Sequence, residues 1–106
     1  MRGKVVLMII KLAPYAPIDS GETLTIYKRS DVLTINGERF DFRELPEGAT
    51  LPAEAVSCDA LASDVTRING DLVMTLLFPC GPDASVAARF PADIVNPPDG
   101  NVNLPV

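Results

Sequence analysis

Apolar and polar residues alternate with a period of two along several short stretches of this chain. Between Glu22 and Lys28, Leu24 and Ile26 fall on one side of the alternation and polar residues fall on the other. The pattern resumes at Asp31–Ile35 and again at Glu38–Arg43. A period of two is typical of half-buried β-strands, whereas amphipathic helices repeat every 3.6 residues. These stretches therefore predict strands.

The dipeptide Asn36-Gly37 separates two of these stretches. Asn and Gly tolerate the positive φ angles of a two-residue type I′ turn, so the dipeptide predicts a β-hairpin. The hairpin register then gives four cross-strand pairs: Val32 with Asp41, Leu33 with Phe40, Thr34 with Arg39 and Ile35 with Glu38. We expect the face that carries the large apolar side chains to be buried, and its members are Leu33, Ile35, Phe40 and Phe42.

An eight-residue motif is repeated along the chain. DVLTINGE at Asp31–Glu38 recurs as DVTRINGD at Asp64–Asp71, an offset of 33 positions, and a proline and a glycine follow each copy at matching distances. A repeat array needs about three units to bury its core, and no third copy is present, so a solenoid is excluded. Two explanations stay open: duplication of one hairpin, or convergence of two hairpins on the same turn chemistry.

The second copy predicts a different turn from the first. A two-residue turn at Asn69-Gly70 would place Arg67 opposite Leu72 and mix polar and apolar residues on one face. A three-residue loop, Asn69-Gly70-Asp71, with a glycine bulge avoids this mixture. The bulge would keep four apolar residues together on the buried face: Ile68, Leu72, Met74 and Leu76.

Two further stretches are rich in apolar residues. Leu72–Phe78 (LVMTLLF) is almost continuously apolar, which predicts a central strand covered on both faces. Lys4–Leu12 predicts a first strand that is tucked between neighbours or serves as an interaction edge. Its apolar run ends at Lys11 and is shorter than the apolar region of a signal peptide. No stretch reaches the roughly 20 apolar residues of a membrane-spanning helix.

The remaining segments carry weaker patterns. Leu45–Pro52 predicts a loop, and Ala53–Leu61 predicts a strand or irregular structure, although its Ala and Glu content permits one helical turn. Ser85–Arg89 predicts a short helical turn. Ile94–Val106 predicts a terminal hairpin around Asp99-Gly100, confined by its prolines to a sheet edge.

These elements predict one mainly β domain over residues 1–106, with little or no helix. The expected architecture is a small barrel or a two-layer sandwich of consecutive antiparallel hairpins. A chain of 106 residues, 47% hydrophobic and 22% charged, suits a single globular unit with a modest core. Residues 91–106 are rich in proline, so we expect that segment either to be flexible or to pair only at a sheet edge.

The charge and composition of the chain restrict the classes of function that we expect. The formal net charge of −5 disfavours nucleic acid and anionic membrane surfaces as partners. The chain has no His to serve as a general base or a zinc ligand, and it lacks the glycine-rich phosphate-binding motifs. We therefore assign no catalytic, cofactor-binding or metal-binding residue and do not expect an enzyme or a cofactor. Cys58 and Cys80 are expected to be free thiols rather than a disulfide.

Three runs carry a resemblance to a known group: DVLTINGERFDFRELPEGATLP, DVTRINGDLVMTLLFPCGP and FPADIVNPPDGNVNLP. From Leu24 onward the chain resembles small uncharacterised proteins encoded in the tail and tail-fibre gene regions of phages and prophages. The resemblance brings no catalytic residue. It implies a phage-related accessory or structural protein that assists tail assembly, located in the cytoplasm of a bacterial host or on the virion.

The expected mode of action is protein–protein contact. The partner would be another protein, such as a phage tail component, or a second copy of the chain in a homo-oligomer. The alternative is a β module that binds a small ligand or carbohydrate without catalysis.

Overall fold

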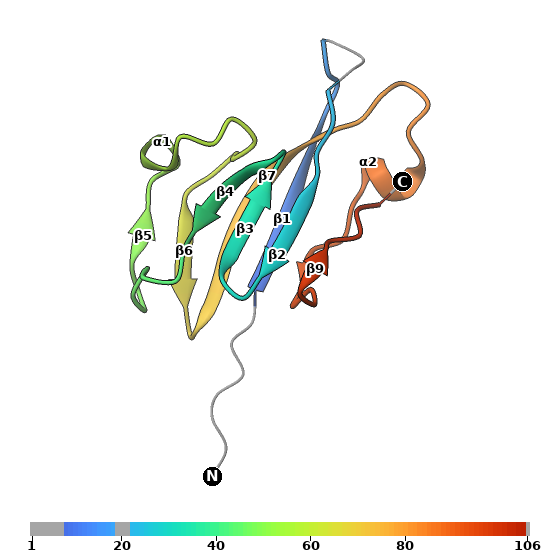
Figure 1. Cartoon of the computed structure of the whole chain (residues 1–106). Helices are drawn as coiled ribbons and strands as arrows, with labels where there is room; N and C mark the ends of the chain where they lie inside the picture. Colours follow the sequence, from blue (N-terminus) through green and yellow to red (C-terminus); the bar gives the residue numbers. More distant parts are fainter. Residues whose placement is uncertain (1–7, 19–21, 106) are drawn as a thin grey trace.

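The computed structural model describes residues 8–18 and 22–105, which form two β-sheets and two single-turn helices (Figure 1). One sheet has five strands in the order β5-β6-β7-β1-β8, and the other has four in the order β4-β3-β2-β9. The five-stranded sheet contains β1 (Met8–Tyr15), β5 (Thr50–Leu51), β6 (Val65–Ile68), β7 (Asp71–Pro79) and β8 (Ile94–Val95). The four-stranded sheet contains β2 (Ile26–Arg29), β3 (Val32–Ile35), β4 (Glu38–Asp41) and β9 (Gly100–Asn101).

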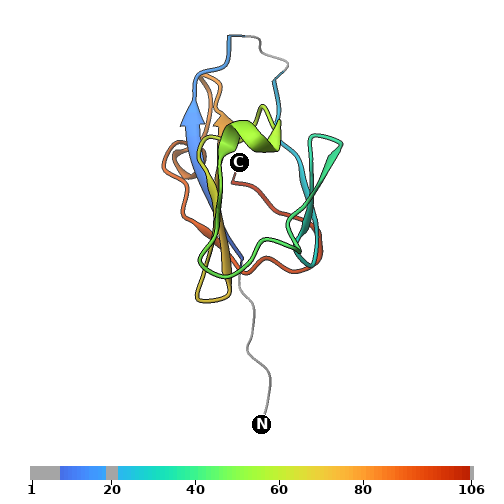
Figure 2. The same ribbon diagram turned by 90° about the vertical axis from the view of Figure 1, so that its left-hand side faces the viewer.

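The two sheets stack as separate layers (Figure 2). Each sheet keeps its own edge strands, so the architecture is the expected mainly β sandwich and not a closed barrel. A single cluster of apolar side chains from both inner faces fills the space between the layers. Seven of its members are at most 2% exposed: Met8, Ile10, Leu33, Val65, Leu72, Met74 and Leu76.

The longest strand pairing is parallel, which the sequence did not predict. β1 runs parallel to β7 over its whole length, from Met8 beside Leu72 to Tyr15 beside Pro79. Because more than fifty residues separate the two strands along the chain, no turn motif marks their pairing. The other pairings in both sheets are antiparallel.

The first hairpin has the predicted turn and register. Asn36 and Gly37 adopt φ angles of 52° and 85°, as a type I′ turn requires. Leu33 lies opposite Phe40 and Ile35 opposite Glu38. The predicted core face is confirmed, because all four of its apolar residues are buried: Leu33, Ile35, Phe40 and Phe42.

The second hairpin contradicts the prediction of a glycine bulge. Asn69 and Gly70 adopt φ angles of 54° and 83°, and Arg67 lies opposite Leu72. The same two-residue turn thus closes both hairpins. Ile68 is consequently 53% exposed on the outer face, and Arg67 is buried in its place at 8% exposure. The register of the two-residue turn is tolerated here because two backbone carbonyls and the Asp31 carboxylate offset the cost of burying the Arg67 guanidinium.

β7 is central in its sheet, as predicted, but only one of its faces lies in the core. Burial alternates along the strand, with Leu72, Met74, Leu76 and Phe78 buried. Val73, Thr75 and Leu77 point outward and are half-buried. The prediction that this strand is covered on both faces is therefore wrong, since neither the described helices nor the second sheet forms a layer over the outer face.

β1 ends later than the predicted first strand. Lys4–Leu7 lies outside the described residues, and the strand continues through Pro14 to Tyr15. β7 pairs with one side of β1 over its full length, whereas β8 pairs with the other side only at Ile9 and Ile10. Proline is tolerated in β1 because no described strand needs its missing N–H beyond that point.

The connections correct two further predictions. Ala53–Val56 forms a helical turn, α1, where we expected a strand or irregular structure, and Ser57 ends it in the left-handed region. The predicted terminal hairpin is absent from the described chain, because β8 pairs with β1 and β9 pairs with β2 in the opposite layer. The proline-rich C-terminal segment thus contributes one short strand to each sheet.

Candidate functional site

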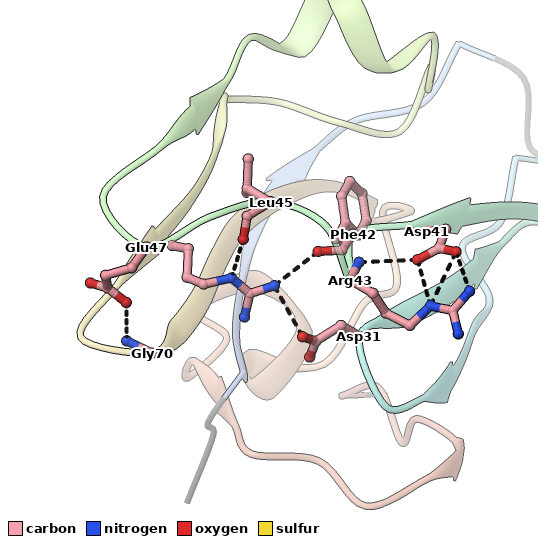
Figure 3. A network of polar contacts seen from close by, with 8 residues as sticks. Asp31, Asp41, Phe42, Arg43, Leu45, Glu47 and Gly70 are labelled. Carbon is pink, nitrogen blue, oxygen red and sulfur yellow. Dashed lines mark hydrogen bonds and ion pairs between the residues drawn. The ribbon is translucent and has the colours of Figure 1, made fainter. Parts of the chain in front are cut away.

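Arg67 is the centre of a buried polar network that joins the two sheets, and Figure 3 labels the residues that accept its hydrogen bonds. Its Nε donates to the carbonyl of Leu45 at 2.6 Å, and its Nη2 donates to the carbonyl of Phe42 at 2.8 Å. Nη2 also lies 3.0 Å from Oδ2 of Asp31. These acceptors fix the guanidinium in place, so the network ties the layers together.

A carboxylate supports the second hairpin turn beside this network. Glu47 accepts hydrogen bonds from the backbone N–H groups of Asn69 at 2.5 Å and Gly70 at 2.6 Å. The first turn is supported differently, because the Asn36 side chain accepts from the N–H of Thr25 at 2.8 Å. The two identical turns are therefore held by different neighbours.

An exposed ion pair lies on the other side of the loop that follows β4 (Figure 3). The Arg43 guanidinium donates to Asp41 at 2.7 Å, and the side-chain hydrogen bond lowers the pKa of Asp41 to about 2. Both groups are solvated and satisfied by each other. This pair contributes local order and offers no group poised for proton transfer.

A cleft with a volume of about 690 Å³ opens at the end of the sandwich where β7 finishes. We call it the α2 cleft, because the helix α2 (Val86–Arg89) forms one of its walls. Its floor consists of core residues from both layers, and these are Leu24, Ile26, Phe78, Ala88 and Val102. The cleft is thus an opening onto the hydrophobic core.

The rim of the α2 cleft is polar and carries only negative charge. Glu22 and Asp83 border it, together with uncharged polar residues such as Thr23 and Asn103. No lysine or arginine is among the described residues that line it. The cleft therefore suits an apolar group that is neutral or has a positive charge nearby.

α2 presents apolar side chains to solvent on its outer side. Ser85 caps the helix by accepting a hydrogen bond from the N–H of Ala88 at 3.1 Å, and Ala88 faces the core. Val86 is 76% exposed and Phe90 is 79% exposed. Arg89 is also exposed, and Phe90 is the residue that caps the C-terminus of α2. We call the three exposed residues Val86, Arg89 and Phe90 the α2 ridge.

Both cysteines are free thiols in the described chain, as predicted. Cys80 lies in the wall of the α2 cleft, and its Sγ donates to the carbonyl of Ala88 at 3.1 Å, which ties α2 to the end of β7. Burial raises the pKa of the Cys58 thiol. A raised pKa suppresses the reactive thiolate, so Cys58 has the character of a structural residue.

The described residues hold no group of three or more His, Cys, Asp or Glu side chains placed to share a metal ion. One carboxylate at the cleft is engaged locally: Glu22 accepts a hydrogen bond from the Tyr15 hydroxyl, and this bond raises the pKa of Tyr15.

Neither helix of the described chain has the length and apolar character needed to cross a bilayer.

The α2 cleft and the α2 ridge were not predicted from the sequence. The ridge had one local signal, an aromatic residue, Phe90, directly before the Pro91 that ends the helical turn. The cleft had none, because its walls come from β2, β7, α2 and the residues after β9. Only the folded chain brings these segments together.

Comparison with known proteins identifies no relative. The sequence matches no protein-family model, and neither a curated protein nor a solved structure matches it. The chemistry of the surface is therefore the structural evidence that bears on how the chain acts.

Proposed function

We propose that this chain is a non-catalytic protein-interaction module that acts as an accessory or structural component in phage tail assembly. The observation that carries the proposal is the exposure of Val86 and Phe90 beside an apolar cleft. Large side chains this exposed are costly to leave in water, and buried aromatic residues dominate the energetics of protein interfaces.

The biological context comes from the resemblance of three sequence runs to proteins of phage tail and tail-fibre gene regions. A module of this kind would act in the cytoplasm of a bacterial host during assembly, or remain on the virion. The net charge of −5 favours protein over nucleic acid as the partner.

The experiment is co-expression of the tagged chain with the tail proteins encoded by neighbouring genes, followed by purification and identification of retained proteins. Phe90→Ser should abolish retention of a defined tail protein. Ile68→Ser is the matched control, because Ile68 is also an exposed apolar residue but lies on the outer face of the five-stranded sheet. Equal retention by the wild type and Phe90→Ser would contradict the proposed surface.

The volume of the cleft supports a second candidate, a module that binds a small apolar ligand. About 690 Å³ falls within the roughly 300–1,000 Å³ that is typical of small-molecule pockets. Titration with an uncharged fluorescent probe such as Nile red tests it. Asn103→Trp, which adds bulk to an exposed position of the cleft wall, should abolish the fluorescence increase if the probe binds there.

A further inference from the structure

We propose that the α2 cleft receives the α2 ridge of a second copy of this chain, so that copies assemble head to tail. The inference rests on the proposed function, because it names the partner for the same surface. Its basis is the complementarity of two features that one chain carries: an apolar cleft with an acidic rim, and an apolar ridge that contains a cation.

The apolar parts of the two features match. The cleft floor is made of aliphatic and aromatic side chains, and its volume of about 690 Å³ leaves space for more than one inserted side chain. The ridge supplies Val86 and Phe90, which are the two most exposed large apolar residues after Ile18 in the described chain. Insertion would remove both from water at once.

The charges match as well. Arg89 lies between Val86 and Phe90 on the exposed side of α2, and its Nη2 donates to the carbonyl of Pro82 at 2.5 Å, which holds it at this end of the molecule. The chain has 9 basic against 14 acidic residues, and Arg89 places one of these cations on the ridge. Glu22 and Asp83 on the cleft rim would attract it.

A chain cannot fill its own cleft with its own ridge. Ala88 of α2 and the N-cap residue Ser85 form part of the cleft wall, whereas Val86 and Phe90 do not line the cleft and are exposed to solvent. The ridge must therefore enter the cleft of another molecule. Because the ridge and the cleft are different surfaces, the contact is heterologous and generates rings or open filaments rather than a closed two-fold dimer.

Sedimentation velocity of the full chain over a range of concentrations provides the test. The wild type should form species larger than a dimer, and added salt should weaken them because the contact includes a charge pair. Phe90→Ser should weaken association by about 30-fold or more, the loss expected for a hot-spot aromatic. Val95→Ser removes a comparably exposed apolar side chain from the outer sheet face and should leave association unchanged.

A mixing experiment separates this contact from general stickiness. Phe90→Ser lacks the ridge aromatic but keeps an open cleft, whereas Asn103→Trp keeps the ridge but has an obstructed cleft. Each variant alone should be monomeric. Their mixture should form a one-to-one dimer that grows no further, because one productive ridge and one productive cleft remain. Circular dichroism of each variant confirms that it is folded.

Two results would overturn the inference. One is a wild type that stays monomeric at all concentrations, and the other is a mixture of the two variants that forms no dimer although the wild type assembles. The proposed function fails on a different result, which is retention of the same tail proteins by the wild type and by Phe90→Ser. A monomeric chain that binds a tail protein through Phe90 would refute only the self-assembly.

Discussion

The guanidinium of Arg67 lies 3.0 Å from the carboxylate of Asp31, and this ion pair joins the two copies of the repeated motif. Asp31 is the first residue of DVLTINGE, and Arg67 is the fourth residue of DVTRINGD. One copy contributes to each layer of the sandwich, so the pair also connects the layers. The copies differ at three positions, and one of these, Thr34 in the first copy and Arg67 in the second, supplies the cation of this link.

Replacing Arg67 with methionine should destabilise the fold by about 3–5 kcal/mol, the cost typical of removing one partner from a buried ion pair. The variant leaves the carbonyls of Phe42 and Leu45 and the Asp31 carboxylate without this donor. Arg67→Lys should lower the free energy of unfolding by less than Arg67→Met, because it keeps the positive charge. It should still be less stable than the wild type, because lysine lacks the planar guanidinium that reaches several acceptors. Urea unfolding at neutral pH measures both free energies.

Arg39→Met is the control for this prediction. Arg39 is 63% exposed and lies 3.9 Å from Asp41, so its replacement should change the free energy of unfolding by no more than about 0.5 kcal/mol. If Arg67→Met proves as stable as Arg39→Met, the buried network does not hold the layers together.

Gly37→Ala should destabilise the first hairpin by about 1–2 kcal/mol, because its φ of 85° is strained for a residue with a Cβ atom. No atom lies within 4 Å of the added methyl group, so the loss is conformational rather than steric. Gly81→Ala is the matched control, since that site is equally open and has no positive φ. It should be neutral or slightly stabilising by thermal unfolding, and equal losses at the two sites would contradict the turn assignment.

Asp41 should make folding sensitive to acid. Its pKa is lowered from 3.8 to about 2 in the folded chain, chiefly by the hydrogen bond from Arg43. A lowered folded-state pKa means that the carboxylate stabilises the fold above pH 4 and that this contribution disappears as the pH falls toward 2. A carboxyl-carbon NMR titration should therefore place the Asp41 midpoint near pH 2.

Two arginine variants test the cause of that lowered pKa. Arg43→Gln should return the Asp41 midpoint most of the way to the ordinary value, because it removes the contact at 2.7 Å. Arg39→Gln should move it much less, since that guanidinium is 3.9 Å away. Similar effects of the two replacements would show that general charge, and not the Arg43 hydrogen bond, lowers the pKa.

Cys58 should alkylate slowly at neutral pH. Burial raises the pKa of its thiol, so the reactive thiolate forms only at higher pH in the folded chain than in the unfolded one. The pH dependence of iodoacetamide labelling in a Cys80→Ala background measures this, with the urea-unfolded protein as reference. Coincident folded and unfolded profiles would be inconsistent with a raised pKa caused by the partial burial of Cys58.

The first hairpin illustrates how far local pattern leads. Asn36-Gly37 sets the turn, and the period-two alternation then assigns Leu33 and Phe40 to the core without knowledge of any other segment. The second hairpin has the same turn, yet the alternation there places Arg67 inward. The carbonyl groups that accept hydrogen bonds from Arg67 belong to a loop more than twenty positions away in the sequence. The local pattern could therefore not reveal that this buried charge has hydrogen-bond partners.

The sequence by itself determined the β class, the first Asn-Gly turn with its register and the short helical turn at Ser85–Arg89, because each depends on neighbouring residues or on composition. Only the tertiary structure decided the parallel pairing of β1 with β7, the separate pairing of β8 and β9, and the α2 cleft. These features bring together segments that are distant in the chain. Their energies come from the burial of surfaces that meet only after folding, and a one-dimensional pattern carries no record of which surfaces meet.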